Sequence, residues 1–127
     1  MIDYAQFPEL TGVYLEDSYV LAITERPGAL TFALEAVLTP EHPYHHPPRP
    51  GEQYCYARAT LLTFTDVTGL EWIRRSPRRY VDAAGQEDLG NIDSLTPERG
   101  AYHLDGDWGE VRVFTGRRPR LEYASPR

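Results

Sequence analysis

The chain has 127 residues, of which 41% are hydrophobic and 25% charged, and its formal net charge is −6. This length and composition predict one folded domain, residues 1–127, with its own core. The acidic charge argues against general affinity for nucleic acid or anionic membranes, because both kinds of partner need a basic surface.

The cellular location follows from what the sequence lacks. Residues 1–10 show neither the basic start nor the apolar run of a signal peptide. No apolar stretch approaches the ~20 residues that a membrane-spanning helix needs. The single cysteine, Cys55, has no partner for an intramolecular disulfide. We therefore expect a soluble protein of the cytoplasm.

A β-hairpin is predicted over residues 19–38. Its turn is Pro27-Gly28, because proline presets a negative φ and glycine accepts the positive φ that follows. The second arm alternates, so that five residues share one face of the strand: Leu30, Phe32, Leu34, Ala36 and Leu38. Before the hairpin, residues 13–15 predict a short strand and residues 16–18 a polar bend. Residues 1–12 predict a leader over the domain, with a helix as an alternative within residues 1–10.

A proline-rich loop follows at residues 39–52. Prolines exclude both a helix interior and a central strand, because each one removes a backbone donor. Five of them lie here: Pro40, Pro43, Pro47, Pro48 and Pro50. The segment should connect two strands of one sheet and project from its edge or end.

The remaining segments predict further strands. In the strand at residues 53–64, alternation places Tyr54, Tyr56, Arg58, Thr60, Leu62 and Phe64 on one face. Residues 74–90 carry four arginines and predict an exposed loop, with a helix as an alternative at residues 85–91. Further strands are expected at residues 67–73, 91–96, 101–104, 108–114 and 120–123. With no helical periodicity, this spacing predicts an all-β, single-domain antiparallel sandwich or partly open barrel of about seven to nine strands with little helix.

Three histidines in the proline-rich loop are candidate metal ligands. His42, His45 and His46 lie beside Glu41, and imidazoles with a carboxylate suit a divalent transition metal such as zinc, nickel or copper. The alternative is a solvated loop whose histidines are incidental, because nothing local orients their rings.

The candidate binding surface is acidic and aromatic. We assign to it Glu16, Asp17, Arg58, Asp107 and Trp108. Tight turns also select the sequence Asp-Gly-Asp at residues 105–107, because aspartate bonds to its own backbone. No nucleophile, phosphate-binding or dinucleotide motif is present, so no catalytic residue is assigned.

Two segments resemble a known group of proteins. Residues 15–20 read Leu-Glu-Asp-Ser-Tyr-Val, and residues 106–113 read Gly-Asp-Trp-Gly-Glu-Val-Arg-Val. They resemble small uncharacterised bacterial domains that open with Leu-(His or Glu)-Asp-Ser, some of which are assigned as immunity proteins of toxin systems. The resemblance implies an antiparallel β domain without an established catalytic centre. The proline-rich loop is not part of that pattern.

Three functional hypotheses follow. The first is a non-catalytic binding protein, immunity-like in character, that binds a basic protein partner. The alternative is a small-molecule or metal-binding β domain that uses the loop with His42, His45 and His46, in which case it could be an enzyme. Either function is compatible with a homodimer, because an exposed sheet edge can pair with its copy.

Overall fold

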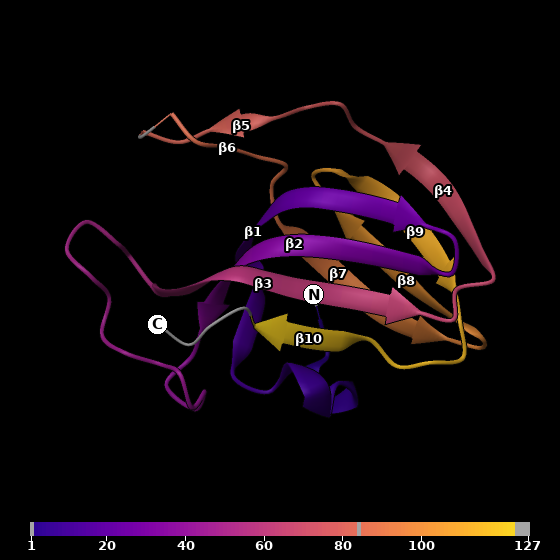
Figure 1. Ribbon diagram of the computed structural model, residues 1–127, viewed down its shortest axis with the longest axis horizontal. Helices are drawn as coiled ribbons and strands as arrows, with labels where there is room; N and C mark the ends of the chain where they lie inside the picture. Colours follow the sequence, from indigo (N-terminus) through magenta and orange to yellow (C-terminus); the bar gives the residue numbers. More distant parts are fainter. Residues whose placement is uncertain (1, 84, 124–127) are drawn as a thin grey trace.

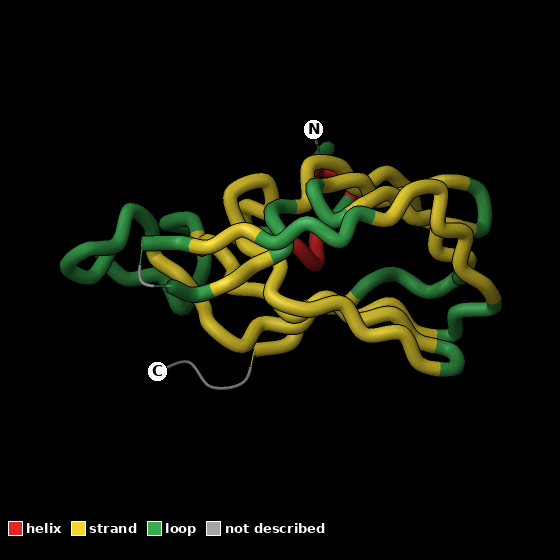
Figure 2. Tube along the Cα trace, turned by 90° about the horizontal axis from the view of Figure 1, so that it is seen from above, coloured by secondary structure: helices red, strands yellow, loops and turns green. Residues whose placement is uncertain are grey.

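The computed structural model describes residues 2–83 and 85–123, which form two antiparallel four-stranded sheets stacked as a sandwich (Figures 1 and 2). The first sheet has the order β1 (Val13–Arg26), β2 (Ala29–Leu38), β3 (Cys55–Thr65), β10 (Arg120–Tyr123). The second has the order β4 (Gly69–Arg75), β9 (Gly109–Phe114), β8 (Ala101–Gly106), β7 (Ile92–Glu98). The prediction of an all-β antiparallel domain is confirmed, and of the two expected architectures the structure has the sandwich.

The core lies between the two sheets. All five residues predicted to share a face of β2 are buried, none more than 4% exposed. Phe32 from this face packs against Phe64 of β3 and against Trp108, with ring centroids 6.4 and 5.1 Å apart. The predicted turn is also present, because Arg26 pairs with Ala29 and Gly28 has a φ of 79°.

The predicted bend at residues 16–18 lies inside one continuous strand. The pairing of β1 with β2 shifts between Tyr14 and Tyr19, so that β1 carries extra residues opposite β2. The buried Ser18 closes this irregularity: its Oγ donates to the carbonyl oxygen of Tyr14 at 2.7 Å and accepts the N–H of Val37 at 2.8 Å. The hydroxyl thereby replaces a missing ladder bond, which lets the strand continue.

A second bulge overturns the predicted faces of β3. The register shifts where β2 passes from Leu34 to Ala36, and Ala59 of β3 adopts a positive φ of 59°. Thr60, Leu62 and Phe64 share one face, as predicted, and this face is buried, but Cys55 is also buried while Arg58 is exposed. A single period of two residues therefore does not hold across this strand, because a bulge exchanges the two faces.

The N-terminal segment closes one side of the sandwich. It forms two short 3₁₀ turns, Tyr4–Gln6 and Pro8–Leu10, and buries Phe7 and Leu10 in the core. The proline-rich loop joins β2 to β3 and projects from the end of the first sheet (Figure 1), as predicted.

The segment expected to be a loop at residues 74–90 contains regular structure. Strand β4 runs to Arg75, and β5 (Tyr80–Val81) pairs with β6 (Glu87–Asp88) in a small ribbon. The ribbon projects at the same end of the sandwich as the proline-rich loop (Figure 1). Its return is tied to β1, because the N–H of Leu89 donates to the carbonyl of Val20 at 2.7 Å. The ribbon raises the number of strands among the described residues to ten.

The described residues include no helix long and apolar enough to cross a membrane.

Candidate functional site: an acidic cleft beside the ribbon

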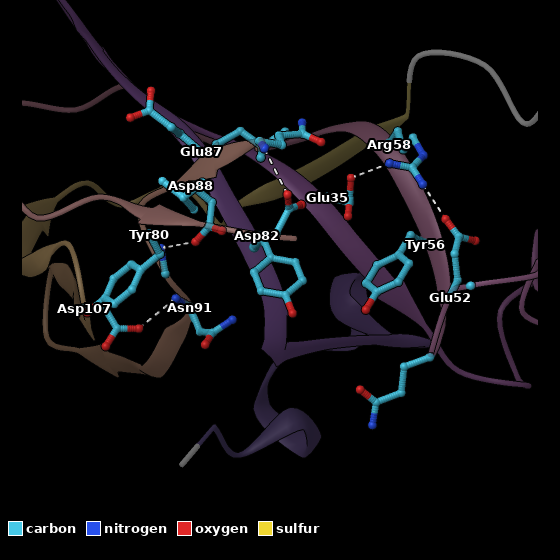
Figure 3. A pocket seen from close by; sticks show the side chains of 17 residues that line it. Glu35, Glu52, Tyr56, Arg58, Tyr80, Asp82, Glu87, Asp88, Asn91 and Asp107 are labelled. Carbon is cyan, nitrogen blue, oxygen red and sulfur yellow. Dashed lines mark hydrogen bonds and ion pairs between the residues drawn. The ribbon is translucent and has the colours of Figure 1, made fainter. Parts of the chain in front are cut away.

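A cavity of about 660 Å³ lies between the outer face of the first sheet and the ribbon β5–β6 (Figure 3). The end of the proline-rich loop forms a third wall. We call this cavity the acidic cleft, because six carboxylates and one guanidinium are the charged groups among the described residues that line it. They are Glu35, Glu52, Asp82, Glu87, Asp88, Asp107 and Arg58.

The sheet side of the cleft follows from the strand geometry. Glu35 lies at an outward position of β2, between the buried residues Leu34 and Ala36. Tyr19 of β1 pairs with Glu35, and Tyr56 of β3 packs on Tyr19 with ring centroids 6.2 Å apart. The three strands therefore present one carboxylate and two phenol rings to the same space.

Arg58 links two carboxylates at the cleft. Its Nη1 lies 2.6 Å from Oε2 of Glu35, and its Nη2 pairs with Oε2 of Glu52. The Arg58 side chain remains 55% exposed, whereas those of Glu35 and Glu52 are mostly buried. The second oxygen of Glu52 is buried and accepts no hydrogen bond from any residue that the structure describes. The guanidinium of Arg58 therefore leaves one carboxylate oxygen of Glu52 available to accept a hydrogen bond.

Backbone N–H groups hold the carboxylates of the opposite wall. Asp88 accepts the N–H of Gly90 at 2.7 Å, and Asp107 accepts the N–H of Asn91 at 3.0 Å (Figure 3). Asp82 accepts the N–H of Gln86 at 2.9 Å and so closes the ribbon turn. These bonds orient the acidic side chains in the folded protein, without a ligand.

The electrostatics of the cleft oppose further negative charge. Burial raises the pKa of Glu35 above its ordinary value, and the carboxylates of Glu52, Asp82 and Asp88 add to this rise against the opposing effect of Arg58. Burial, followed by the nearby Tyr19 and Glu35, raises the pKa of Tyr56 to about 12. The phenol is therefore neutral at physiological pH. An entering cation would relieve the repulsion among the carboxylates.

Aromatic rings continue from the cleft across the sheet. The rings of Tyr54 and Tyr56 meet edge to face, with centroids 6.1 Å apart. The hydroxyl of Tyr54 donates to Asp17 at 3.1 Å. Tyr80 adds a partly exposed ring on the ribbon side. Such rings offer rigid contact area and a π face that attracts cations.

The structure brings two of the five predicted binding residues into the cleft, namely Arg58 and Asp107. Asp17 lies at the far end of the row of tyrosines. Glu16 accepts the N–H of Ile2 at 3.1 Å and the hydroxyl of Tyr4, so its carboxylate anchors the N-terminal segment. Trp108 is 3% exposed and belongs to the core, outside the cleft.

The residues of the Leu-Glu-Asp-Ser segment each have a structural role. Leu15 is fully buried, and Glu16 and Asp17 bond to Tyr4 and Tyr54. Ser18 closes the bulge in β1. These contacts show that each residue of the Leu-Glu-Asp-Ser segment helps to stabilise the fold.

The three loop histidines lie in different surroundings. His42 is buried, and its Nε2 lies 2.9 Å from the hydroxyl of Tyr123 while its Nδ1 accepts the N–H of Tyr44 at 3.0 Å. Burial, with a smaller effect of His45, lowers the pKa of His42. His46 directs its Nδ1 to the carbonyl oxygen of Pro47 at 2.8 Å. Within residues 2–83 and 85–123, no group of three or more histidine, cysteine or acidic side chains is arranged to hold a metal ion.

Sequence reasoning missed most of the cleft. Glu35 had a detectable signal, since it is the one charged residue in the alternating apolar strand at residues 29–38. Glu52 and the ribbon residues gave none, because their role depends on a ribbon and a loop that meet only in the folded chain.

Comparisons of the chain with protein-family models, curated proteins and solved structures found no match.

Proposed function

We propose that this protein is a non-catalytic binding domain whose acidic cleft receives a basic segment of a protein partner. The observation that carries the proposal is the charge of the cleft, whose described lining residues include six with carboxylates and one arginine that is already paired. A cationic side chain would find acceptors there and aromatic rings beside them. Complementary charge would also accelerate the encounter with a basic partner.

The preorganisation of the cleft supports a binding role. Asp88 and Asp107 are held by backbone N–H groups, and Glu35 and Glu52 by Arg58. A surface whose groups are already ordered loses little conformational entropy when it binds. An immunity-like protein that blocks a basic toxin in the bacterial cytoplasm fits these properties, and we include that role in the proposal.

The test uses a fluorescent peptide with two arginines and an otherwise identical peptide with two citrullines, which keep the shape of arginine but carry no charge. Fluorescence anisotropy at low salt measures both affinities. The proposal expects the arginine peptide to bind and the citrulline peptide to bind much more weakly. Added salt should weaken the binding of the arginine peptide, because salt screens exposed charges.

A pair of double variants separates the cleft from the total charge. Glu35→Gln with Glu87→Gln removes two carboxylates of the cleft, whereas Glu71→Gln with Glu98→Gln removes two beside Arg112 on the second sheet. The first should weaken binding about 2- to 30-fold, because an exposed charge interaction contributes about 0.2–1 kcal/mol. The second should have little effect. Equal losses in the two variants, or equal binding of the two peptides, would refute the proposal.

A further inference from the structure

We propose that a second cavity, which we call the indole groove, binds a small amphipathic anion with one carboxylate and an apolar body. The groove has a volume of about 420 Å³ and lies between the β1 edge at Leu21 and Ile23 and the second sheet at Trp72 and Trp108. Its size is within the range of small-molecule sites, about 300–1,000 Å³. It shares Leu21 with the acidic cleft, but its charged lining residues are arginines, whereas those of the cleft are mainly acidic.

The position of the groove follows from the sandwich. Strands β1 and β4 are both edge strands, and the chain from β4 to β5 passes over the edge of β1 (Figure 1). This connection is held at its start, because the N–H of Ser76 donates to the carbonyl oxygen of Trp108 at 3.0 Å. Pro77 and Arg79 of the same connection then line the groove.

The walls of the groove are mainly apolar. Leu21, Ile23 and Leu89 line it on the side of the first sheet and the ribbon. Trp72 and Trp108 line the other side, with their ring centroids 6.1 Å apart and their planes at 89°. An alkyl or aromatic body would bury apolar surface against these groups, which is the main source of affinity in such sites.

The charged groups of the groove are cationic. The guanidinium of Arg75 lies 3.9 Å from the ring centroid of Trp72, and its Nη2 lies 3.1 Å from Oε2 of Glu25, so its position is held from two sides. The side chain of Arg79 forms no hydrogen bond or ion pair with another described residue. No carboxylate is among the described residues that line the groove.

This arrangement favours a ligand with a negative charge. In a chain with a net charge of −6, the groove presents two guanidiniums beside an apolar wall, of which that of Arg75 is paired with Glu25. A carboxylate can approach Arg79 without displacing an existing partner and can share the outer N–H donors of Arg75. A cation of the same length would meet the two guanidiniums, and the carboxylate of Glu25 is already engaged, because it pairs with Arg75 and accepts Nε1–H of Trp72 at 2.7 Å.

The chain offers a direct optical test. It contains two tryptophans, and both line the groove, so its tryptophan fluorescence reports on this site. Octanoate, octanol and octylamine are titrated into the full-length protein, since they share an alkyl chain and differ in charge. We expect octanoate to change the emission saturably, octanol to bind more weakly and octylamine to bind weakest.

Two single variants test the role of Arg79. Arg79→Gln should weaken octanoate binding about two- to fivefold, the effect of one exposed ion pair, and should leave octanol binding unchanged. Arg78→Gln makes the same change of charge one residue away, outside the groove, and should leave both affinities unchanged. Ala22→Glu places a carboxylate in the groove from the exposed edge of β1 and should abolish octanoate binding.

Three outcomes would overturn the proposal: no saturable change with octanoate, binding of octylamine as tight as that of octanoate, or equal effects of Arg79→Gln and Arg78→Gln on octanoate affinity. Because these ligands do not carry the charge that the acidic cleft favours, failure here leaves the proposed protein-binding function untouched.

Discussion

The guanidinium of Arg58 reaches Glu35 at 2.6 Å because Ala59 beside it adopts a left-handed backbone conformation, with a φ of 59°. The bulge exchanges the faces of β3, so that Cys55 turns to the core while Arg58 turns to the outer face. One local distortion thus supplies the only described cation of the acidic cleft.

The raised pKa of Glu35 predicts an unusual dependence of stability on pH. The pKa of Glu35 in the unfolded chain is near 4.5. The folded state therefore binds a proton at Glu35 at a higher pH than the unfolded state does. The ionised carboxylate therefore costs stability above its folded pKa, and this cost disappears as the pH falls towards 4.5. Urea unfolding should show Glu35→Gln gaining stability relative to wild type as the pH rises from 4.5 to 7.

Glu98 provides a control of opposite sign. Its hydrogen bond to Arg112 lowers its pKa below the ordinary value. Ionised Glu98 therefore stabilises the fold above about pH 4.5, and this contribution is lost as the pH falls through its folded pKa. Glu98→Gln should lose stability relative to wild type as the pH rises. If the two variants followed the same course, the environments described for both carboxylates would be wrong.

His42 should make the attachment of the proline-rich loop sensitive to acid. Its folded pKa lies below the ordinary 6.5, so the unfolded chain takes up the proton first as the pH falls. Stability should therefore decrease below about pH 6.5, and His42→Ala should reduce this dependence. The same variant should cost roughly 1–3 kcal/mol at pH 7.5, because the N–H of Tyr44 loses its acceptor.

His45→Ala is the matched control, since the side chain of His45 makes no hydrogen bond to any residue that the structure describes. Its effect on the free energy of unfolding should stay within ~0.5 kcal/mol. Urea unfolding between pH 5 and 7.5 measures both variants. If His42→Ala lost stability below pH 6.5 as strongly as the wild type does, the acid sensitivity would arise from another group.

Ser18 should be required for the stability of the long hairpin. Ser18→Ala leaves the buried N–H of Val37 without its acceptor, which should cost about 1–3 kcal/mol in urea unfolding. Ser76→Ala removes an equivalent hydroxyl whose bond to the N–H of Arg78 is exposed, and should cost less than ~0.5 kcal/mol. Equal losses of unfolding free energy in the two variants would show that the hydrogen bonds of Ser18 across the bulge stabilise the fold no more than the exposed bond of Ser76 does.

The sequence by itself determined the class of the fold and much of its strand pattern. Alternation from Leu30 to Leu38 identified the residues that share the core-facing side of β2, because the two faces of a strand differ in their contact with water, although Val37 of the other face is buried as well. Pro27-Gly28 identified the hairpin turn through the backbone angles that these two residues favour. Both signals are local, so they can be detected in a short window of residues.

Only the tertiary structure decided the faces of β3 and the composition of the two cavities. The bulge at Ala59 depends on how β3 pairs with β2, and an alanine carries no signal for a positive φ. The acidic cleft joins Glu35 and Glu52 to ribbon residues around Asp88, and the indole groove joins Ile23 to Trp72 and Arg79. Their proximity results from the stacking of two sheets and the return of the ribbon to β1. No local pattern encodes such contacts, because they arise between segments far apart in the chain.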